Sequence, residues 1–284
     1  MGRLAYHGAM RVSHRRRRAL GQHWLVDRRI LARIARAARF GPEDTVVEVG
    51  PGTGLLTELL ARRASRLIAV EVDPDLAAAL RERFHGRDNV SVLESDVLAL
   101  TPEEILSRGG GRPPYVVAGN LPYSIGSAIV RHFLAARAQP RWLLATLQSE
   151  VARNMAAGPG RMSFLSVETQ YYAEPRVLFD IPPSAFRPPP KVMSALLRLD
   201  TLDGAAVEVD DREAFFRLVQ AGFAAPRKRL RNALAIGLKC RPVEAEAMLA
   251  EAGLDPIRRA QTLTLDEWAT LYSVYRRPTA AVPQ

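Results

Sequence analysis

Four consecutive residues, Asn120-Leu121-Pro122-Tyr123, place an amide, a rigid proline and an aromatic ring directly after the apolar run 115–117. Such a run predicts a buried strand, and ligands bind at the carboxyl ends of strands in α/β folds. The Asn120 amide can accept and donate hydrogen bonds, and Tyr123 offers a flat face to a planar ring. These groups suit recognition of an exocyclic amine on an aromatic base. In isolation the same residues also fit a simple turn with a half-buried tyrosine.

A second group of residues, upstream, predicts a cofactor site. The β-branched run 45–49 leads into Gly50-Pro51-Gly52-Thr53-Gly54, where Gly50 and Gly52 let the backbone approach a ligand closely. Glu71 is expected at the end of the next strand, within reach of ribose hydroxyls, and Asp96 at the end of the third, near an adenine amine. The glycine spacing differs from dinucleotide motifs, so the set favours S-adenosylmethionine. Each acid alone could instead be an exposed strand-end residue or a helix cap.

The elements that must position these groups alternate between strand and helix, which predicts a mostly parallel, doubly wound α/β sheet. Expected strands cover 45–49, 67–72, 90–94, 115–117, 142–147, 176–181 and 195–199. Expected helices between them begin after the capping residues Asp27 and Asp73 and near 125, 151 and 167. Beyond residue 202 the pattern is helical only, at 213–223, 227–238, 243–251 and 266–275. The predicted organisation is a basic arm (1–19), a catalytic domain (20–201), a helical domain (202–277) and a tail (278–284).

The charge is concentrated at the start of the chain. Residues 1–40 hold eleven arginines and one acidic residue, Asp27, which equals the whole formal net charge of +10 over 284 residues. A basic arm of this kind favours nucleic acid or an anionic surface, because arginine pairs with phosphate, and a solvated tail is the alternative. The chain has only three lysines, so the nucleotide composition of the genome is an alternative explanation of the arginine bias.

Other classes of protein are disfavoured by composition. No apolar run approaches the length of a membrane span, the N-terminus does not read as a secretory signal, and Cys240 is the single cysteine. Without a cluster of Cys and His at ligand spacing, we expect no metal site. Cytoplasmic location is the expectation.

Several segments together resemble the KsgA family of S-adenosylmethionine-dependent rRNA adenine N6,N6-dimethyltransferases, from about Arg18 to Tyr275. They are Leu20-Gly21-Gln22-His23-Trp24-Leu25, Glu48-Val49-Gly50-Pro51-Gly52-Thr53-Gly54, Gly119-Asn120-Leu121-Pro122-Tyr123, Leu147-Gln148-Ser149-Glu150-Val151, Pro182-Pro183-Ser184-Ala185-Phe186, Pro188-Pro189-Pro190-Lys191-Val192 and Arg227-Lys228-Arg229-Leu230-Arg231-Asn232.

The resemblance implies a Rossmann-like class I methyltransferase sheet with a small all-helical C-terminal domain. The first segment usually reads Gly-Gln-Asn-Phe-Leu in the family, whose Asn and Leu contact the cofactor. His23 and Leu25 occupy these positions here, and His23 is a departure from the pattern.

The resemblance also implies catalytic roles. The Asn120 side-chain oxygen and the Leu121 carbonyl accept hydrogen bonds from the adenine amine, Tyr123 stacks on the base and Phe186 closes its other side. Asn120 thus serves both the catalytic and the cofactor site. We expect no metal, covalent intermediate or dedicated general base.

The implied substrate is two adjacent adenines in the loop of the terminal hairpin of small-subunit rRNA, in a precursor of the small ribosomal subunit, with the protein acting as a monomer. Basic residues expected on the RNA are Arg15, Arg16, Arg17, Arg18, Arg227, Lys228, Arg229 and Arg231. The second cluster could also be the solvated face of a helix. Two alternatives stay open: a resistance methyltransferase acting on large-subunit rRNA, and a non-catalytic RNA-binding assembly factor.

Overall fold

The computed structural model describes residues 23–277, so the predicted arm residues Arg15, Arg16, Arg17 and Arg18 lie outside the described part of the chain. The strands form a mixed seven-stranded sheet in the order β4-β3-β2-β5-β6-β9-β7, accompanied by helices, and the α/β prediction is confirmed. The described chain divides into two compact units, one with residues 23–129 and 181–193, the other with 130–180 and 194–277.

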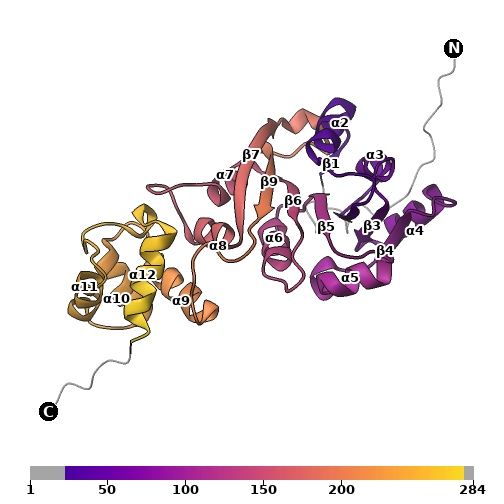
Figure 1. Cartoon of the computed structure of the whole chain (residues 1–284). Coiled ribbons are helices and arrows are strands. Elements are labelled where there is room, and N and C mark those ends of the chain that lie inside the picture. Colours follow the sequence, from indigo (N-terminus) through magenta and orange to yellow (C-terminus); the bar gives the residue numbers. More distant parts are fainter. Residues whose placement is uncertain (1–22, 278–284) are drawn as a thin grey trace. The chain divides into compact units, whose positions relative to one another are not determined.

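Four parallel strands build the first unit, and Figure 1 labels β3, β4 and β5 among them. They are β2 (Thr45–Val49), β3 (Arg66–Glu71), β4 (Val90–Glu94) and β5 (Tyr115–Asn120). Val49 pairs in register with Val70 on one side and Gly119 on the other. The register therefore brings Gly50, Glu71 and Asn120, each the next residue along, to the same edge of the sheet.

Helices of this unit begin where the sequence supplies a cap. Asp27 accepts hydrogen bonds from the backbone of Arg29 and Ile30 at the start of α2 (Arg28–Ala37), and Asp73 does the same for α4 (Pro74–Arg83). Both predicted caps are confirmed. The other two helices, α3 (Leu55–Ala61) and α5 (Pro102–Gly109), begin at the left-handed Gly54 and at a capping box on Thr101.

A two-stranded antiparallel sheet, absent from the sequence prediction, joins distant segments of the first unit. Strand β1 (Trp24–Leu25) pairs with β8 (Phe186–Arg187), in the proline-rich segment that follows the short helical turn η2 (Pro183–Ala185). The backbone amides of Val26 and Asp27 both donate to the carbonyl oxygen of Ala185. The N-terminal segment is thereby fixed beside the loop 182–190.

The second unit contains β6 (Trp142–Gln148), β7 (Ala173–Ile181, with Ile181 in the first unit) and β9 (Ser194–Thr201), and β6 pairs antiparallel with β9. Helices α7 (Ser149–Met155) and α8 (Phe164–Tyr172) belong to it, and α6 (Gly126–Leu134) crosses the division between the units. After residue 202 the described chain is helical, as predicted, with α9 (Arg212–Gly222), α10 (Leu230–Leu238), α11 (Pro242–Glu251) and α12 (Leu265–Tyr275).

One predicted helix boundary is wrong. The helix expected at 227–238 begins at Leu230, and Arg227, Lys228 and Arg229 form an exposed segment before it, with Arg229 at the capping position. The reason is local: the backbone of Lys228 closes a turn on Ala225, and Leu230 donates to the carbonyl oxygen of Arg258. The cluster therefore does not lie along the face of a helix. Among residues 23–277, no helix is long and apolar enough to cross a membrane.

Candidate active site

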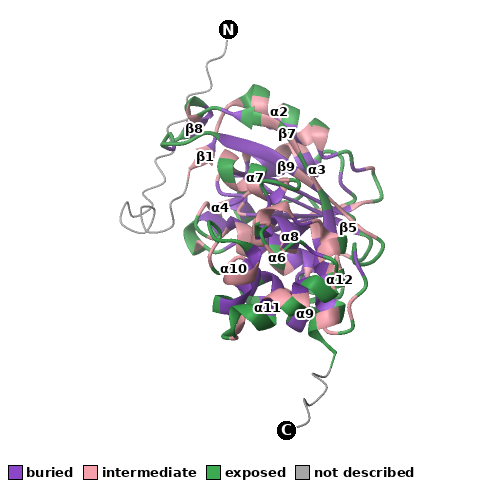
Figure 2. Cartoon of the chain, turned by 90° about the vertical axis from the view of Figure 1, so that its left-hand side faces the viewer, coloured by how far each residue is buried: buried purple, intermediate pink, exposed green. Residues whose placement is uncertain are grey.

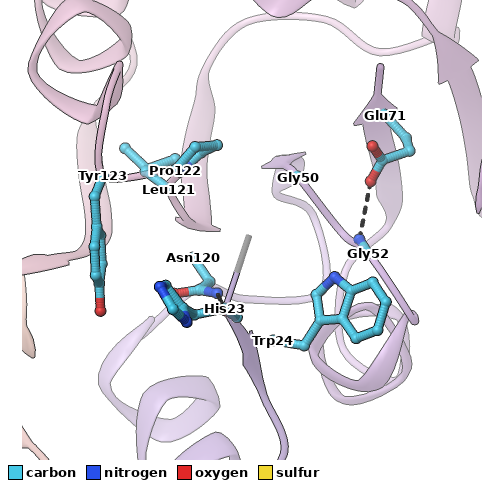
Figure 3. Close-up of a pocket in the computed structure, with 9 residues that line it drawn as sticks. All are labelled: His23, Trp24, Gly50, Gly52, Glu71, Asn120, Leu121, Pro122 and Tyr123. Carbon is cyan, nitrogen blue, oxygen red and sulfur yellow. Dashed lines mark hydrogen bonds between the residues drawn. The ribbon is translucent and has the colours of Figure 1, made fainter. Parts of the chain in front are cut away.

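The ends of β2, β3 and β5, together with the start of β1, surround a pocket of about 410 Å³, a volume that includes space open to solvent (Figure 3). The pocket is lined by His23, Trp24, Gly50, Gly52, Glu71, Asn120, Leu121, Pro122 and Tyr123. Seven residues predicted from the sequence thus meet in one place: His23, Gly50, Gly52, Glu71, Asn120, Leu121 and Tyr123.

Glu71 and the glycine loop are joined directly. The backbone N–H of Gly52 donates to one carboxylate oxygen of Glu71 at 3.0 Å, and the N–H of Asp73 donates to the other at 3.0 Å. The Glu71 side chain is 2% exposed, and burial raises its pKa, while these backbone donors oppose that effect. Gly50 and Gly52 have φ of +66° and +56°, a backbone conformation that favours glycine. This set can receive two hydroxyl donors beside a closely approaching ligand.

Asn120 has a fixed orientation at the end of β5. Its Nδ2 donates to the backbone carbonyl oxygen of His23 at 2.8 Å. This bond uses the amide nitrogen and leaves the amide oxygen, Oδ1, as the acceptor. Its Oδ1 is shielded from solvent and has no hydrogen-bond partner among the described residues. A buried unpaired acceptor costs roughly 1–3 kcal/mol, so this oxygen is suited to receive a hydrogen bond from a ligand.

Three aromatic side chains belong to the walls of the pocket. The His23 ring lies 5.5 Å from the ring centroid of Tyr123, tilted by 34°, and its Nδ1–H donates to the carbonyl oxygen of Pro188 at 2.8 Å. The Trp24 indole lies against Gly52, where a Cβ atom would come within 3.2 Å of it. Figure 3 shows Tyr123 on one side of the pocket and Trp24 with Gly52 on the other.

Three predicted site residues do not line this pocket. Leu25 and Phe186 are buried partners across the β1–β8 sheet. Asp96 is exposed and accepts a hydrogen bond from the backbone of Leu98 at 2.9 Å, so it caps the short helical turn η1 (Val97–Ala99). Asp96 is therefore a helix cap, which was the alternative to a cofactor contact in the sequence analysis.

The sequence pattern missed a buried acid next to the site. Glu48 lies within β2, is 1% exposed, and one of its carboxylate oxygens has no hydrogen-bond partner among the described residues. Burial, reinforced by the negative charge of Glu71, raises the pKa of Glu48 from 4.5 to about 8. The apolar residues on both sides of Glu48 could have revealed it in the sequence. A single acid in a buried strand must either be protonated or have a partner.

Two apolar side chains at the ends of adjacent strands were also missed. Val72 follows β3 and is 49% exposed, and Leu98 follows β4 and is 36% exposed. The parallel neighbours β3 and β4 end side by side, with Glu71 opposite Glu94. Val72 and Leu98 come after these ends, so they lie at the same edge of the sheet. Exposed apolar groups beside Glu71 and Asp96 suit a planar base.

The basic cluster in the second unit is only partly available. Arg227, Lys228 and Arg229 are exposed, whereas Arg231 forms an ion pair with Glu246 at 2.9 Å. Positive side chains just before a helix N-terminus gain nothing from the helix dipole. The three exposed residues and the positive N-terminal end of α10 can together attract an anion.

The groups in the pocket fit S-adenosylmethionine beside an adenine. A glycine cradle, a buried carboxylate with two oxygens and an unpaired amide oxygen supply the contacts that a nucleoside cofactor and an exocyclic amine require. Within the described residues, no group of His, Cys, Asp and Glu side chains has an arrangement that could hold a metal ion.

Comparison with known proteins gives consistent matches over most of the chain. The family model described as "Ribosomal RNA adenine dimethylase" matches residues 13–276. A curated protein of Dehalococcoides mccartyi, "Ribosomal RNA small subunit methyltransferase A", is 43% identical over 92% of this chain and 89% of its own length. The protein of the same name from Moorella thermoacetica is 44% identical over 90% of this chain and 91% of its own length.

Two solved structures share the fold. The 23S rRNA methyltransferase ErmE superposes with a TM-score of 0.68 at 32% identity, covering 88% of this chain and 98% of its own. A dimethyladenosine transferase from Plasmodium falciparum superposes with a TM-score of 0.73 at 22% identity, covering 88% of this chain and 96% of its own.

Proposed function

Since the chain belongs to the ribosomal RNA adenine dimethylase family, we propose that its substrate is small-subunit rRNA, at N6 of two adjacent adenosines in the loop of the 3′-terminal hairpin. The protein is an rRNA adenine dimethyltransferase whose cofactor is S-adenosylmethionine. The observation that carries the proposed site is the shielded, unpaired Oδ1 of Asn120 beside the Glu71 cradle.

The cofactor is held by the residues at the sheet edge. Gly50 and Gly52 would receive its methionine part, Glu71 would accept hydrogen bonds from the ribose hydroxyls, and Asp96 with Val72 and Leu98 would accommodate the adenine. His23 and Leu25 complete the site from β1. When bound, S-adenosylmethionine supplies an electrophilic methyl group on sulfonium.

Catalysis rests on positioning of the substrate amine. The lone pair of N6 is delocalised into the adenine ring, so the amine is a poor nucleophile. Asn120 Oδ1 and the Leu121 carbonyl oxygen accept its two N–H groups and hold the lone pair toward the methyl donor. Tyr123 stacks on the base, which must leave its helix or loop to reach the pocket. The proton is acidic once nitrogen is alkylated, so water can take it.

Phe186 has a different position from the one its expected role requires. Phe186 is fully buried and pairs with Leu25 across the β1–β8 sheet. Covering the second face of the base requires a rearrangement of the loop 182–190, and this role stays a prediction. In the position observed, Phe186 supports the segment that carries His23 and Trp24.

RNA contacts are proposed for both ends of the chain. The predicted arm with Arg15, Arg16, Arg17 and Arg18 and the exposed residues Arg227, Lys228 and Arg229 hold flanking phosphates, and Arg231 contributes less because Glu246 neutralises it. We propose residues 20–201 as the catalytic domain and 202–277 as a helical RNA-binding domain. The protein would act as a monomer, without metal, on a precursor of the small subunit in the cytoplasm.

A large-subunit target is the second candidate, supported by the 32% identity with ErmE. The small-subunit target is favoured, because relatives with that name reach 43–44% identity over about nine-tenths of the chain. A non-catalytic assembly factor fits less well with an intact Asn120 and Tyr123.

The test is transfer of labelled methyl groups from S-adenosylmethionine to undermethylated small subunits, with large-subunit RNA in parallel and identification of the modified base. We expect dimethyladenine in small-subunit RNA alone. Label only in large-subunit RNA would assign the protein to the second candidate function. Cofactor binding without any label would favour a binding factor.

A further inference from the structure

The outer face of α2 is entirely basic. Leu31, Ile34 and Ala38 are buried beneath this helix, while Arg29, Arg33 and Arg36 recur along its exposed side at helical spacing. Arg28 in the first turn and Arg39 after the last turn are also exposed. The helix itself carries no acidic residue. Figure 2 shows the exposed positions of α2 in green.

Three of these arginines lack the acidic partners that several other arginines of the same unit have. Within residues 23–277, no acidic side chain forms an ion pair with Arg28, Arg29 or Arg36. On α3, α4 and α5, by contrast, Arg62, Arg81, Arg83 and Arg108 are paired with Glu58, Glu94, Glu58 and Glu104. A genomic preference for arginine would explain why these residues are arginine and not lysine. It would not explain why they have no acidic partners. Arg28, Arg29 and Arg36 are therefore available to an external anion.

The position of two of them also opposes local stability. Arg28 and Arg29 occupy the first turn of α2, where the partial positive charge of the helix N-terminus disfavours cations by about 0.3–1 kcal/mol each. Asp27 caps the helix through its side chain and offsets part of this cost. A helix that keeps two arginines at this end is better suited to an anionic partner than to solvent.

We propose that the arginine face of α2, formed by Arg28, Arg29, Arg36 and Arg39, binds backbone phosphates of the substrate RNA next to the base that enters the pocket. The proposal rests on the proposed function, because that function supplies the RNA. It adds a phosphate-binding surface made of residues other than those of the predicted arm and the cluster at Arg227.

The connection of α2 to the pocket supports this location. His23 and Trp24 line the pocket, and only Leu25, Val26 and Asp27 separate them from the first residue of the helix. The amides of Val26 and Asp27 are held on the carbonyl oxygen of Ala185, so this link is fixed. Arg29 and Arg36 are separated by about 10 Å along the helix axis, a length that can serve more than one phosphate of a strand.

The experiment compares the double variant Arg29→Gln, Arg36→Gln with the control Arg62→Gln, Arg108→Gln. Both remove two exposed positive charges from the same unit, but only the control residues are ion-paired. Binding to undermethylated small-subunit particles is measured over a range of salt concentrations, and S-adenosylmethionine affinity is measured by calorimetry. Each lost phosphate contact lowers the slope of log affinity against log salt by about 0.7–0.9.

We expect the α2 variant to lower the slope by about 1.4–1.8 and to weaken particle binding, with cofactor affinity unchanged and the control close to wild type. Equal slopes in wild type and the α2 variant, with wild type methylating the particle, would overturn the α2 surface and leave the proposed function standing. An equal effect of both variants would also overturn it, since only net charge would then matter. Wild-type protein that neither binds nor methylates small-subunit particles would instead remove the proposed function.

Discussion

Asn120 Nδ2 donates to the backbone carbonyl oxygen of His23 at 2.8 Å, although the two residues are 97 positions apart. A carbonyl oxygen can only accept, so this bond fixes which end of the amide is the acceptor. The contact uses the backbone of His23 and not its imidazole. The orientation of the amide is thereby independent of the side chain at position 23.

Asn120→Ala removes the proposed acceptor for the adenine amine. We expect methyl transfer to fall by at least ~10²-fold, as for loss of a preorganised polar contact, and S-adenosylmethionine affinity, measured by calorimetry, to fall much less. Asn120→Asp keeps acceptor oxygens but loses the donor to His23, so it should also lose activity. Equal loss of affinity and transfer in the alanine variant would refute the role.

His23→Asn restores the residue that the family usually has and keeps the backbone carbonyl. Because Asn120 depends on that carbonyl, we expect transfer within a few-fold of wild type. The variant loses the ring contact with Tyr123 and the imidazole hydrogen bond to Pro188. Rate and cofactor affinity are measured together, and a loss as large as that of Asn120→Ala would show that the imidazole itself takes part.

Glu71 predicts a pH dependence of cofactor affinity. Burial raises its pKa, so the charged form that accepts two hydroxyls is lost at a higher pH than for an ordinary glutamate. Affinity should be full above that pKa and fall as the pH is lowered through it. Calorimetry over pH checks this, and Glu71→Gln should bind about 10–100-fold more weakly at neutral pH with a flatter profile.

The matched control is Glu94→Gln, at the end of the adjacent strand β4 and paired with Arg81 on the surface. It should leave both affinity and pH profile unchanged. A control that weakens binding as much as Glu71→Gln would trace the effect to general charge.

Glu48→Gln should stabilise the protein at alkaline pH. The folded-state pKa of Glu48 is raised from 4.5 to about 8, so between these values the folded chain holds a proton that the unfolded chain has lost. Its contribution to stability is present below the lower value and declines as pH rises through the higher one. In urea unfolding, the free energy of unfolding of the variant should exceed that of wild type by on the order of a few kcal/mol at pH ~9. At pH ~5 the two free energies should differ little. A difference independent of pH would contradict the buried neutral acid.

Deletion of residues 1–19 tests the predicted basic arm. We expect the salt dependence of RNA binding to flatten, because Arg15, Arg16, Arg17 and Arg18 would no longer neutralise phosphates. Catalysis on saturating substrate should persist. The same slope with and without these residues would show that the arm does not touch RNA.

The sequence was informative where the signal is local. Asp27 and Asp73 predicted two helix starts, and β-branched runs predicted the strands whose ends carry Gly50, Glu71 and Asn120. The β1–β8 pair escaped prediction because each strand has only two residues and the pairing is distant. The Asn120–His23 contact escaped because a bond to a backbone carbonyl leaves no trace in residue type. The helix at 227 was started too early because Arg227–Arg229 have good helix propensity, which the turn at Ala225 overrides.

The pairing of β1 with β8 also constrains the order in which the pocket can form. His23 meets Pro188 across 165 positions, so closing this contact carries the entropy cost of a long loop. During synthesis from the N-terminus, the pairing of β1 with β8 and the contact of His23 with Pro188 cannot form until the chain beyond 188 has emerged. The nascent protein can therefore complete its sheet edge well before it can hold a cofactor, and methylation activity should appear only after about two-thirds of the chain has left the ribosome.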